Sequence, residues 1–386
     1  MNVRYIDRLQ FHETFLNINS IKDQTGLTIC NSVTEFLKQN NLFSRIEAAE
    51  RDGAPAMTGV ENGFTAHFSK ETGNKCTFVH CVAHRLNLAV MSVKSTPEVK
   101  GLCDLIYNLC QFLSDSPKRV QVLKDHQDKL NLKLIKPFYI RWMSSFDANE
   151  RVILLFKEIV ETLSDFKNFS VIAEGLLSKM CHFTTLLNLC GFTDILGVLK
   201  NLTLEFQKQR RVISSVNTDI KYTISCLNEL ISNGTFVGNL SYHLIHEYKS
   251  AGTYCGVKLH LKENEDLNNE INNFSDVMKT VLVQIIKNLE SRFLSDHVLK
   301  IFDLFDFEKI ISADIKEDYG CQNLREIANF INIVMKPEIK IDIEIALKQY
   351  NKLKPCLKIM FKNADLSNIN SVIHSTYYGI LLNMVK

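Results

Sequence analysis

The residues best suited to chemistry begin with an acid in a tight loop, "DGAPAMTG" at residues 52–59. A Gly and a Pro follow Asp52, just after a segment that the sequence predicts to be a strand. A carboxylate presented in such a loop can hold Mg²⁺ or Mn²⁺, and a two-metal site needs two or three of them in one place. The alternative is a surface turn with a solvated Asp52, because turns favour Asp and Gly in any case.

A second candidate site is "HCVAHRLNLAV", residues 80–90. Cys81 and His84 are three residues apart, so on a helix they share one face, and both residue types bind zinc. A structural zinc needs four ligands, and the sequence offers no second pair at a usual spacing. The alternatives are a buried Cys81 beside a His that packs at the helix start, or a His that contacts phosphate next to the acid.

Basic residues next to an aromatic ring form the third candidate site. Arg141 and Trp142, the only Trp, lie in "IRWMSSFDA". The Arg could bind phosphate or stack on a base, whereas a lone Trp is typical of a core anchor. Arg210 and Arg211, in "KQRR", could contact DNA phosphates or belong to a solvated helix end.

Strands and helices must position these residues. The first 80 residues contain signals for both, with "CTFVHC" at 76–81 as a β-type run and a helix over 27–37 that Thr25 caps. From about residue 83 the periodicity is helical, with a break at Pro117 and a long amphipathic helix over 146–166 capped by Ser145.

The pattern therefore predicts a mainly α protein with a small α/β part. We expect an α/β segment over residues 1–95 and an all-α region over 96–386. Within that region, 234–267 has Gly, Tyr and short β-like runs and is expected to be loop-rich.

Composition limits the function classes. The 386 residues carry 45 Lys plus Arg and 43 Asp plus Glu, and this net charge of +2 gives no global electrostatic case for nucleic-acid binding.

The 11 cysteines are scattered and odd in number, which favours reduced thiols in the nucleus or cytoplasm. The polar N-terminus lacks a signal core, and no run has the roughly 18–20 apolar residues of a membrane span. We expect a protein that is not secreted and not membrane-bound.

Taken in order, "DGAPAMTG", "HCVAHRLNLAV", "SDSPKR" and "RWMSS" resemble the central block of hAT-superfamily DNA transposases, closest to the domesticated, zinc-finger-associated relatives. The leading "VRYIDRLQFHETFLNI" resembles the strand and helix that precede the Asp loop. The resemblance covers residues 1–170 and implies a ribonuclease-H-like core split by a large helical insertion. It further implies that Asp52 is a metal-binding catalytic acid, that His84 positions the scissile phosphate and that Trp142 lies near an unpaired base.

The departures from the family pattern concern the other two acids. The family's first catalytic Asp lies upstream of the region that matches Val3–Ile6, and its third acid lies in an "ERxFS"-like motif that is absent here. The chain resembles a core truncated at both ends, and one acid of three cannot organise a two-metal site. Asp52 is then the relic of a catalytic acid, with Mg²⁺ or Mn²⁺ as the cofactor of any remaining activity.

We therefore expect a catalytically inactive nuclear protein that binds protein partners or, weakly, DNA, and that can form homo-oligomers. One alternative is residual metal-dependent DNA processing, with the missing acids supplied by another chain of an oligomer. A SUMO-ligase-like role rests on family analogy alone, since no RING-type Cys/His array is present. A truncated reading frame without function is the remaining alternative, because a missing first strand would leave a sheet edge unpaired.

Overall fold

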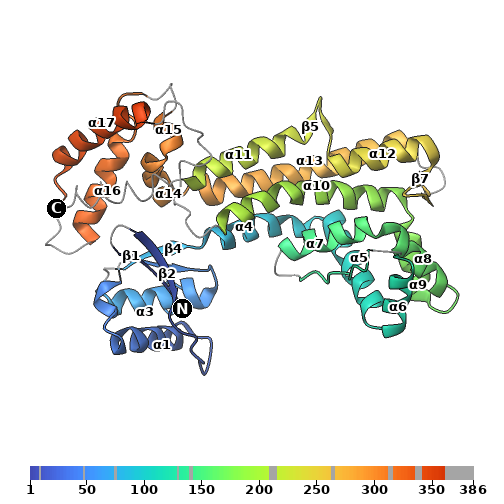
Figure 1. Ribbon diagram of the computed structural model, residues 1–386, viewed down its shortest axis with the longest axis horizontal. Helices are drawn as coiled ribbons and strands as arrows, with labels where there is room; N and C mark the ends of the chain where they lie inside the picture. The colour runs from blue at the N-terminus through green and yellow to red at the C-terminus, as the bar shows by residue number, and fades with distance from the viewer. Residues whose placement is uncertain are drawn as a thin grey trace. The chain divides into compact units, whose positions relative to one another are not determined.

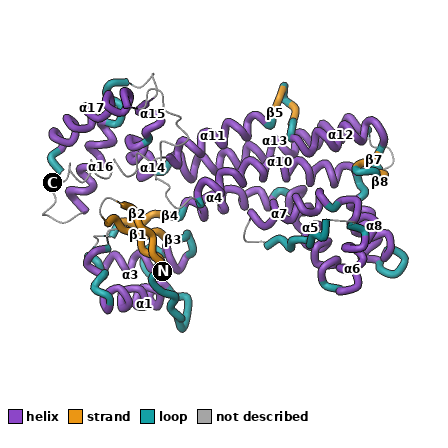
Figure 2. The backbone as a smooth tube through the Cα atoms, viewed as in Figure 1, coloured by secondary structure: helices purple, strands orange, loops and turns teal. Residues whose placement is uncertain are grey.

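A computed structural model describes residues 1–360 except 8–9, 47, 74–75, 128–129, 139–141, 208–214, 262–265, 312–315 and 335–340. Helices dominate the described chain and its strands are short (Figures 1 and 2), which confirms the prediction of a mainly α protein. The chain forms two compact units. Unit 1 comprises Met1–Arg85, Phe206–Thr218 and the chain from Phe293 onward, and unit 2 comprises Leu86–Glu205 and Asp219–Arg292. Unit 2 thus interrupts unit 1 twice along the sequence, and the chain beyond Phe293 groups with the N-terminal segment.

The N-terminal part of unit 1 is a small α/β segment. Its elements are β1 (Asn2–Asp7), β2 (Gln10–Phe15), α1 (Gly26–Gln39), β3 (Ala48–Arg51), α2 (Pro55–Thr58), α3 (Phe64–Glu71) and β4 (Thr77–His80). Strands β1 and β2 pair antiparallel, β3 and β4 pair parallel, and the described strands of the chain form only two-stranded sheets. A larger ribonuclease-H-like sheet therefore stays a prediction.

Residues 10–15 differ from the expectation of a helix after the first strand. They form β2, which pairs along its whole length with β1, from Asn2↔Phe15 to Asp7↔Gln10. The six-residue ladder places Tyr5 beside His12, with ring centroids 5.2 Å apart and nearly parallel. Cross-strand pairs of this kind override a weak local preference for helix.

Helix α1 begins where the sequence predicts. Thr25 is its N-cap, and the Thr25 hydroxyl oxygen accepts a hydrogen bond from the Thr28 N–H at 3.3 Å. The hydroxyl itself donates to Asp23 at 2.6 Å. The helix packs its apolar face on α3 in a core made of Cys30, Leu37, Phe64, Phe68 and Cys76. Each large side chain buried here stabilises the segment by about 1.5–3 kcal/mol.

Three glycines allow the "DGAPAMTGVENG" loop to pack against the start of α1. A Cβ on Gly63 would lie 2.4 Å from the Gly59 nitrogen and 2.6 Å from the Gly59 oxygen. A Cβ on Gly26 would lie 2.3 Å from the Asn62 carbonyl oxygen. These contacts are between backbones, so only glycine fits at these positions.

The C-terminal part of unit 1 is helical. It contains α14 (His297–Phe302), α15 (Phe307–Ile311), α16 (Cys321–Val334) and α17 (Ile343–Met360). Helices α16 and α17 pack together with α14 and α15 around a second core, whose buried members include Leu304, Ile310, Leu347 and Tyr350.

Unit 2 is a helical array. Helix α4 (Val82–Met91) runs into it from unit 1, and α11 (Val216–Glu229) likewise begins in unit 1. The remaining helices are α5 (Pro97–Ser114), α6 (Pro117–Asp125), α7 (Trp142–Leu154), α8 (Phe156–Phe166), α9 (Val171–Met180), α10 (Phe183–Phe206), α12 (Asn239–Ala251) and α13 (Leu267–Leu289). The predicted break at Pro117 is confirmed, with Ser116 as the N-cap of α6.

Within the described part of the chain, α10 alone has the length and apolar composition of a membrane span. Its apolar window is 61% buried inside the protein. A helix that is apolar on all sides and enclosed by other helices is typical of a protein core.

The helix predicted over 146–166 is in fact two helices. Helix α7 begins at Trp142, four residues early, so Ser145 lies inside it and is not a cap. The chain then breaks at Leu155, which has φ −101° and ψ 23°, and α8 follows. Leu155 is fully buried, so tertiary packing holds a break that the amphipathic pattern does not reveal.

Residues 234–267, expected to be loop-rich, contain the 13-residue helix α12 between two hairpins. The hairpins are β5 (Ile231–Ser232) with β6 (Thr235–Phe236), and β7 (Thr253–Tyr254) with β8 (Val257–Lys258). Asp194 of α10 accepts hydrogen bonds from the N–H groups of Leu240 and Ser241 at 2.9 and 3.1 Å. Because this cap comes from a distant helix, local sequence patterns could not predict the start of α12.

The two hairpins have the same turn with different first residues. The loop pairs are Asn233–Gly234 and Cys255–Gly256, and all four residues have positive φ, between 49° and 76°. Asn adopts this left-handed conformation readily, whereas Cys255 adopts it at a cost of about 1–2 kcal/mol in folding free energy.

We expect Cys255→Asn to raise the free energy of unfolding by about 1 kcal/mol, measured by urea denaturation. The matched change Asn233→Cys should lower it by a similar amount, and equal stabilities of all three proteins would contradict this account.

Candidate functional site

The "DGAPAMTG" and "HCVAHRLNLAV" segments meet at one edge of a sheet. Strands β3 and β4 are parallel with Arg51 opposite His80, so Asp52 and Cys81 follow at the same edge. The Cys81 N–H donates to the Arg51 carbonyl oxygen at 2.8 Å and extends the ladder by one residue. The carboxyl edge of parallel strands is where α/β proteins commonly bind ligands. The structure thus brings Asp52, Cys81 and the start of α4 together.

Asp52 is an exposed residue in a local turn. Its Oδ1 accepts a hydrogen bond from the Ala54 N–H at 3.0 Å, and Pro55 then starts α2. This turn orients the carboxylate without burying it. Exposure keeps the carboxylate accessible, but it also fits the interpretation of Asp52 as a solvated turn residue.

The two histidines of the second motif lie over the chain that follows Asp52. The rings of His80 and His84 have centroids 5.4 Å apart and planes tilted by 33°. A Cβ on Gly53 would lie 2.9 Å from the His80 ring and 3.4 Å from His84 Nε2. Gly53 therefore gives the histidine pair room next to Asp52, which explains a glycine at this position.

Cys81 is half-buried just before α4. Burial raises the pKa of its thiol, nearby Glu50 raises it further, and hydrogen bonds from the His84 and Ala83 backbone partly oppose this. The neutral thiol is accordingly favoured, and a neutral thiol is a poor nucleophile and metal ligand. Cys81 thus resembles a small packed side chain more than an activated one.

Metal binding at this edge would require several ligands to converge. Across the described ranges, no three side chains from His, Cys, Asp and Glu lie close enough together to hold a metal ion. Cys81 and His84 alone fall short of the four ligands of a structural zinc. Asp52 alone falls short of the carboxylate set that positions two Mg²⁺ or Mn²⁺ ions. The residues described at this edge do not fit either metal site.

The Arg85 side chain, which the sequence motifs did not single out, is buried and paired with an acid. It is 8% exposed, and its guanidinium donates to Asp296 Oδ2 at 2.8 Å, across 211 residues of sequence. The guanidinium also lies 4.9 Å from the centroid of the Phe293 ring. Asp296 in turn caps α14 by accepting from the Leu299 N–H at 3.0 Å. The only sequence signal was the cap pattern of Asp296 before an apolar run.

Trp142, expected near an unpaired base, is a core residue. It is 3% exposed at the first position of α7, and its backbone N–H donates to Asn87 Oδ1 at 3.3 Å. An enclosed ring cannot stack on a base, so burial favours the core-anchor interpretation. Arg141, Arg210 and Arg211 lie outside the described residues.

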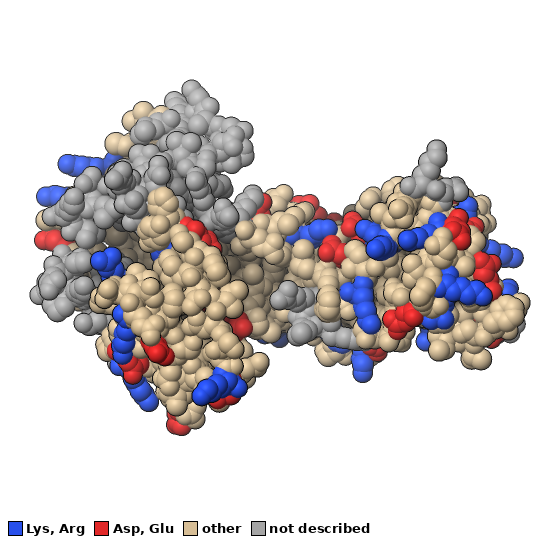
Figure 3. Space-filling model, turned by 60° about the horizontal axis from the view of Figure 1, so that its bottom comes forward, with Lys and Arg blue, Asp and Glu red and all other residues tan. Residues whose placement is uncertain are grey.

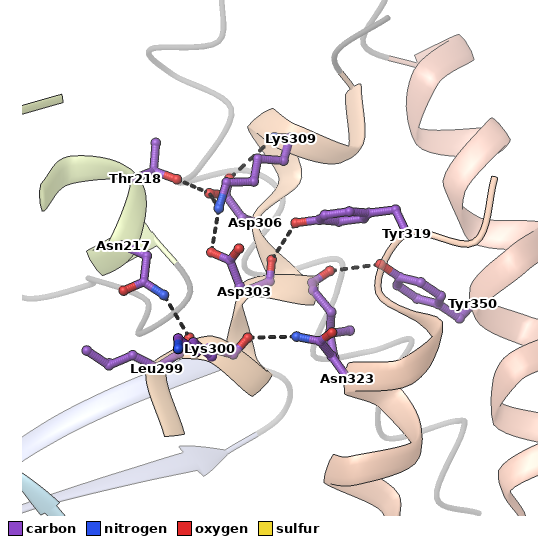
Figure 4. Close-up of polar contacts among 11 residues, drawn as sticks. Asn217, Thr218, Leu299, Lys300, Asp303, Asp306, Lys309, Tyr319, Asn323 and Tyr350 are labelled. Atoms are coloured by element: carbon purple, nitrogen blue, oxygen red, sulfur yellow. Dashed lines mark hydrogen bonds and ion pairs between the residues drawn. The ribbon is translucent and has the colours of Figure 1, made fainter. Parts of the chain in front are cut away.

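A polar network joins α14–α17 to the start of α11 inside unit 1 (Figure 4). Lys309 pairs with both Asp303 and Asp306, and Asp306 also accepts a hydrogen bond from Thr218. The Tyr319 and Tyr350 hydroxyls donate to the carbonyl oxygens of residues 303 and 304 at 2.9 and 3.0 Å. Lys309 thus offsets one of the two negative charges, and each carboxylate has a partner within the network, which assigns both to the scaffold.

The described residues on one face of the molecule form no contiguous basic surface. On the face shown in Figure 3, Lys and Arg side chains alternate with Asp and Glu. A phosphate backbone is bound most readily by a contiguous basic surface.

No protein-family model matches the chain, and no solved structure matches it. The geometry of the described residues must therefore carry any functional argument.

Proposed function

We propose that this chain is a non-catalytic protein derived from an hAT-superfamily transposase, acting in the nucleus as a protein-interaction module. In this proposal the α/β segment is the remainder of a ribonuclease-H-like core, and unit 2 is the inserted helical region. Loss of catalysis is supported by the residues present at the carboxyl edge of β3 and β4. Asp52 is exposed there, and no group of three metal-ligating side chains meets among the described residues. Two-metal phosphoryl transfer depends on such a group.

A second candidate is residual DNA processing with acids from a partner chain. The exposure of Asp52 is the observation that favours it, because an exposed carboxylate is accessible to a second protomer. One assay separates the two candidates.

We expect no strand cleavage when a labelled duplex with an unpaired end is incubated with the full chain in Mn²⁺ or Mg²⁺ at low salt. Wild type, Asp52→Ala and Glu61→Ala should be indistinguishable from a protein-free control on a denaturing gel. Glu61→Ala is the matched control, since Glu61 is an exposed acid of the same loop. Cleavage by wild type and Glu61→Ala that disappears in Asp52→Ala would overturn the proposal and support the second candidate.

A further inference from the structure

Helix α17 concentrates positive charge in a chain whose charges are otherwise almost balanced. It carries four lysines and a single acid, Glu344, whereas the whole chain has a net charge of +2. Glu344 is already paired, because its Oε1 lies 3.2 Å from Arg325 Nη1. Asp342, just before the helix, accepts a hydrogen bond from the Ile345 N–H at 3.1 Å, and no Asp or Glu occurs in residues 345–364. The helix therefore carries cations that no acid of its own offsets.

The two faces of α17 have different environments. The helix packs against α15 and α16 (Figure 1), and its buried apolar residues are Ala346, Leu347, Tyr350 and Leu357. With 3.6 residues per turn, the positions opposite this core face are Ile345, Lys348, Lys352, Cys356 and Ile359. All five are exposed. We call these five residues the α17 stripe.

The two lysines of the α17 stripe lie next to each other on the helix surface. Lys348 and Lys352 are four residues apart, and neither forms an ion pair with a residue that the structure describes. Lys354, by contrast, is buried on the core side, and its Nζ donates to the Tyr319 carbonyl oxygen at 3.2 Å. The stripe thus presents two cations, one helical turn apart, that are available to an anionic partner.

Two isoleucines lie at the ends of the α17 stripe. Ile345 is 53% exposed and Ile359 is 77% exposed. Ile is a poorer helix former than Lys or Gln, and an exposed side chain gains little from burial, so neither residue contributes much to this fold. They are 14 residues apart, which is two heptads and about 21 Å along a helix. Apolar residues at heptad spacing on an exposed face are typical of a helix that packs on another helix.

The charges on the α17 stripe select among the possible partners. In a pair of identical copies, Lys352 of one copy would face Lys352 of the other, whether the helices run parallel or run antiparallel with Ile345 on Ile359. Like charges at such positions oppose pairing. Nucleic acid would leave both isoleucines without an apolar partner, and two cations neutralise few phosphates. Insertion of the isoleucines into a membrane would also bury the lysines between them.

We propose that the α17 stripe binds an acidic helix of a partner protein, which packs two apolar side chains on Ile345 and Ile359 and places Asp or Glu opposite Lys348 and Lys352. The inference rests on the proposed function, since it names the partner class of the interaction module. The charge pairs would determine which helix binds and in which register, and the isoleucines would add buried apolar area.

The test uses the full chain, immobilised, and a phage-displayed library of helical peptides that are randomised along one face. The double variant Lys348→Glu/Lys352→Glu reverses the charge of the stripe at exposed positions. Its matched control is Lys100→Glu/Lys221→Glu, which makes the same chemical changes at exposed lysines of α5 and α11. Circular dichroism verifies that both variants keep the helical content of wild type.

We expect wild type and the control variant to enrich peptides with two apolar residues two heptads apart and Asp or Glu between them. In fluorescence anisotropy, a synthetic enriched peptide should bind Lys348→Glu/Lys352→Glu about tenfold more weakly than wild type. The same peptide with its acids changed to Lys should show the opposite preference, which a merely structural effect of the substitutions would not produce. Ile345→Ser/Ile359→Ser should weaken the binding of both peptides.

No enrichment, enrichment of peptides without acids, or equal binding by the two charge-reversal variants would overturn the proposal. Self-association of wild type that Ile345→Ser/Ile359→Ser abolishes would assign the stripe to a second copy instead. Displacement of the peptide by oligothymidylate or by phosphatidylserine vesicles, dependent on Lys348 and Lys352, would assign it to nucleic acid or to a membrane. Cleavage that depends on Asp52 would overturn the proposed function alone, because the stripe contains no residue of that loop.

Discussion

Replacing Arg85 with Ala is expected to lower the free energy of unfolding by about 3 kcal/mol. The change leaves the Asp296 carboxylate without its cation in a largely enclosed position and removes the guanidinium from the Phe293 ring. Breaking a fully buried ion pair costs about 3–5 kcal/mol, and we expect the lower end because the Asp296 side chain keeps 27% of its exposure. Urea denaturation followed by circular dichroism measures the difference.

Asp296→Asn is the informative control for Arg85→Ala. Asn caps helices as well as Asp, so this variant keeps the hydrogen bond to the Leu299 N–H and removes only the charge. In a double-mutant cycle, the two changes together should cost about 1–2 kcal/mol less than the sum of the single changes. Additive costs would mean that the pair contributes nothing and that Arg85 acts only through packing. Arg85→Lys should restore part of the loss, because the ammonium keeps the charge without the planar geometry.

Gly63→Ala is expected to cost about 3 kcal/mol or more. The new Cβ would lie 2.4–2.6 Å from backbone atoms of Gly59, and a backbone in a packed loop cannot move aside as a flexible side chain can. Relief would require the backbone at Gly59 and Gly63 to move apart inside the loop, and Gly26 of α1 packs just as closely on Asn62 and Gly63. The loss of structure should appear first in the α/β segment, as increased amide hydrogen exchange in α1 and α3.

Gly101→Ala provides the comparison for Gly63→Ala. Gly101 lies on the exposed face of α5, and a Cβ there meets nothing within 4 Å. Ala is a better helix former than Gly, so this variant should gain about 0.5–1 kcal/mol. If Gly63→Ala were tolerated as well as Gly101→Ala, the close packing of the glycine loop would be refuted.

The sequence predicted features that depend on neighbouring residues. The Thr25 cap, the break at Pro117 and the strand before Asp52 are confirmed because a few adjacent side chains determine each of them. The convergence of Asp52 with Cys81 also follows from local patterns once the two strands pair in parallel.

Features that depend on distant residues could not be predicted. Arg85 finds Asp296 across 211 residues, and α12 begins where Asp194 of another helix caps it. In each case the interaction that determines the structure is a tertiary contact, which periodicity and local capping patterns do not predict.

The interrupted order of unit 1 has a consequence for biosynthesis. Its N-terminal segment ends at Arg85, and the chain that supplies Asp296 and α14–α17 begins at Phe293, about 200 residues later. At roughly 5–20 residues per second, the ribosome needs about 10–40 s to cover that distance. During this time the α/β segment emerges with Arg85 unpaired, and unit 2 becomes complete with Arg292, just before the rest of unit 1 is made. Nascent unit 1 is therefore a natural client for chaperones, and unit 2 is the part of the protein that can fold first.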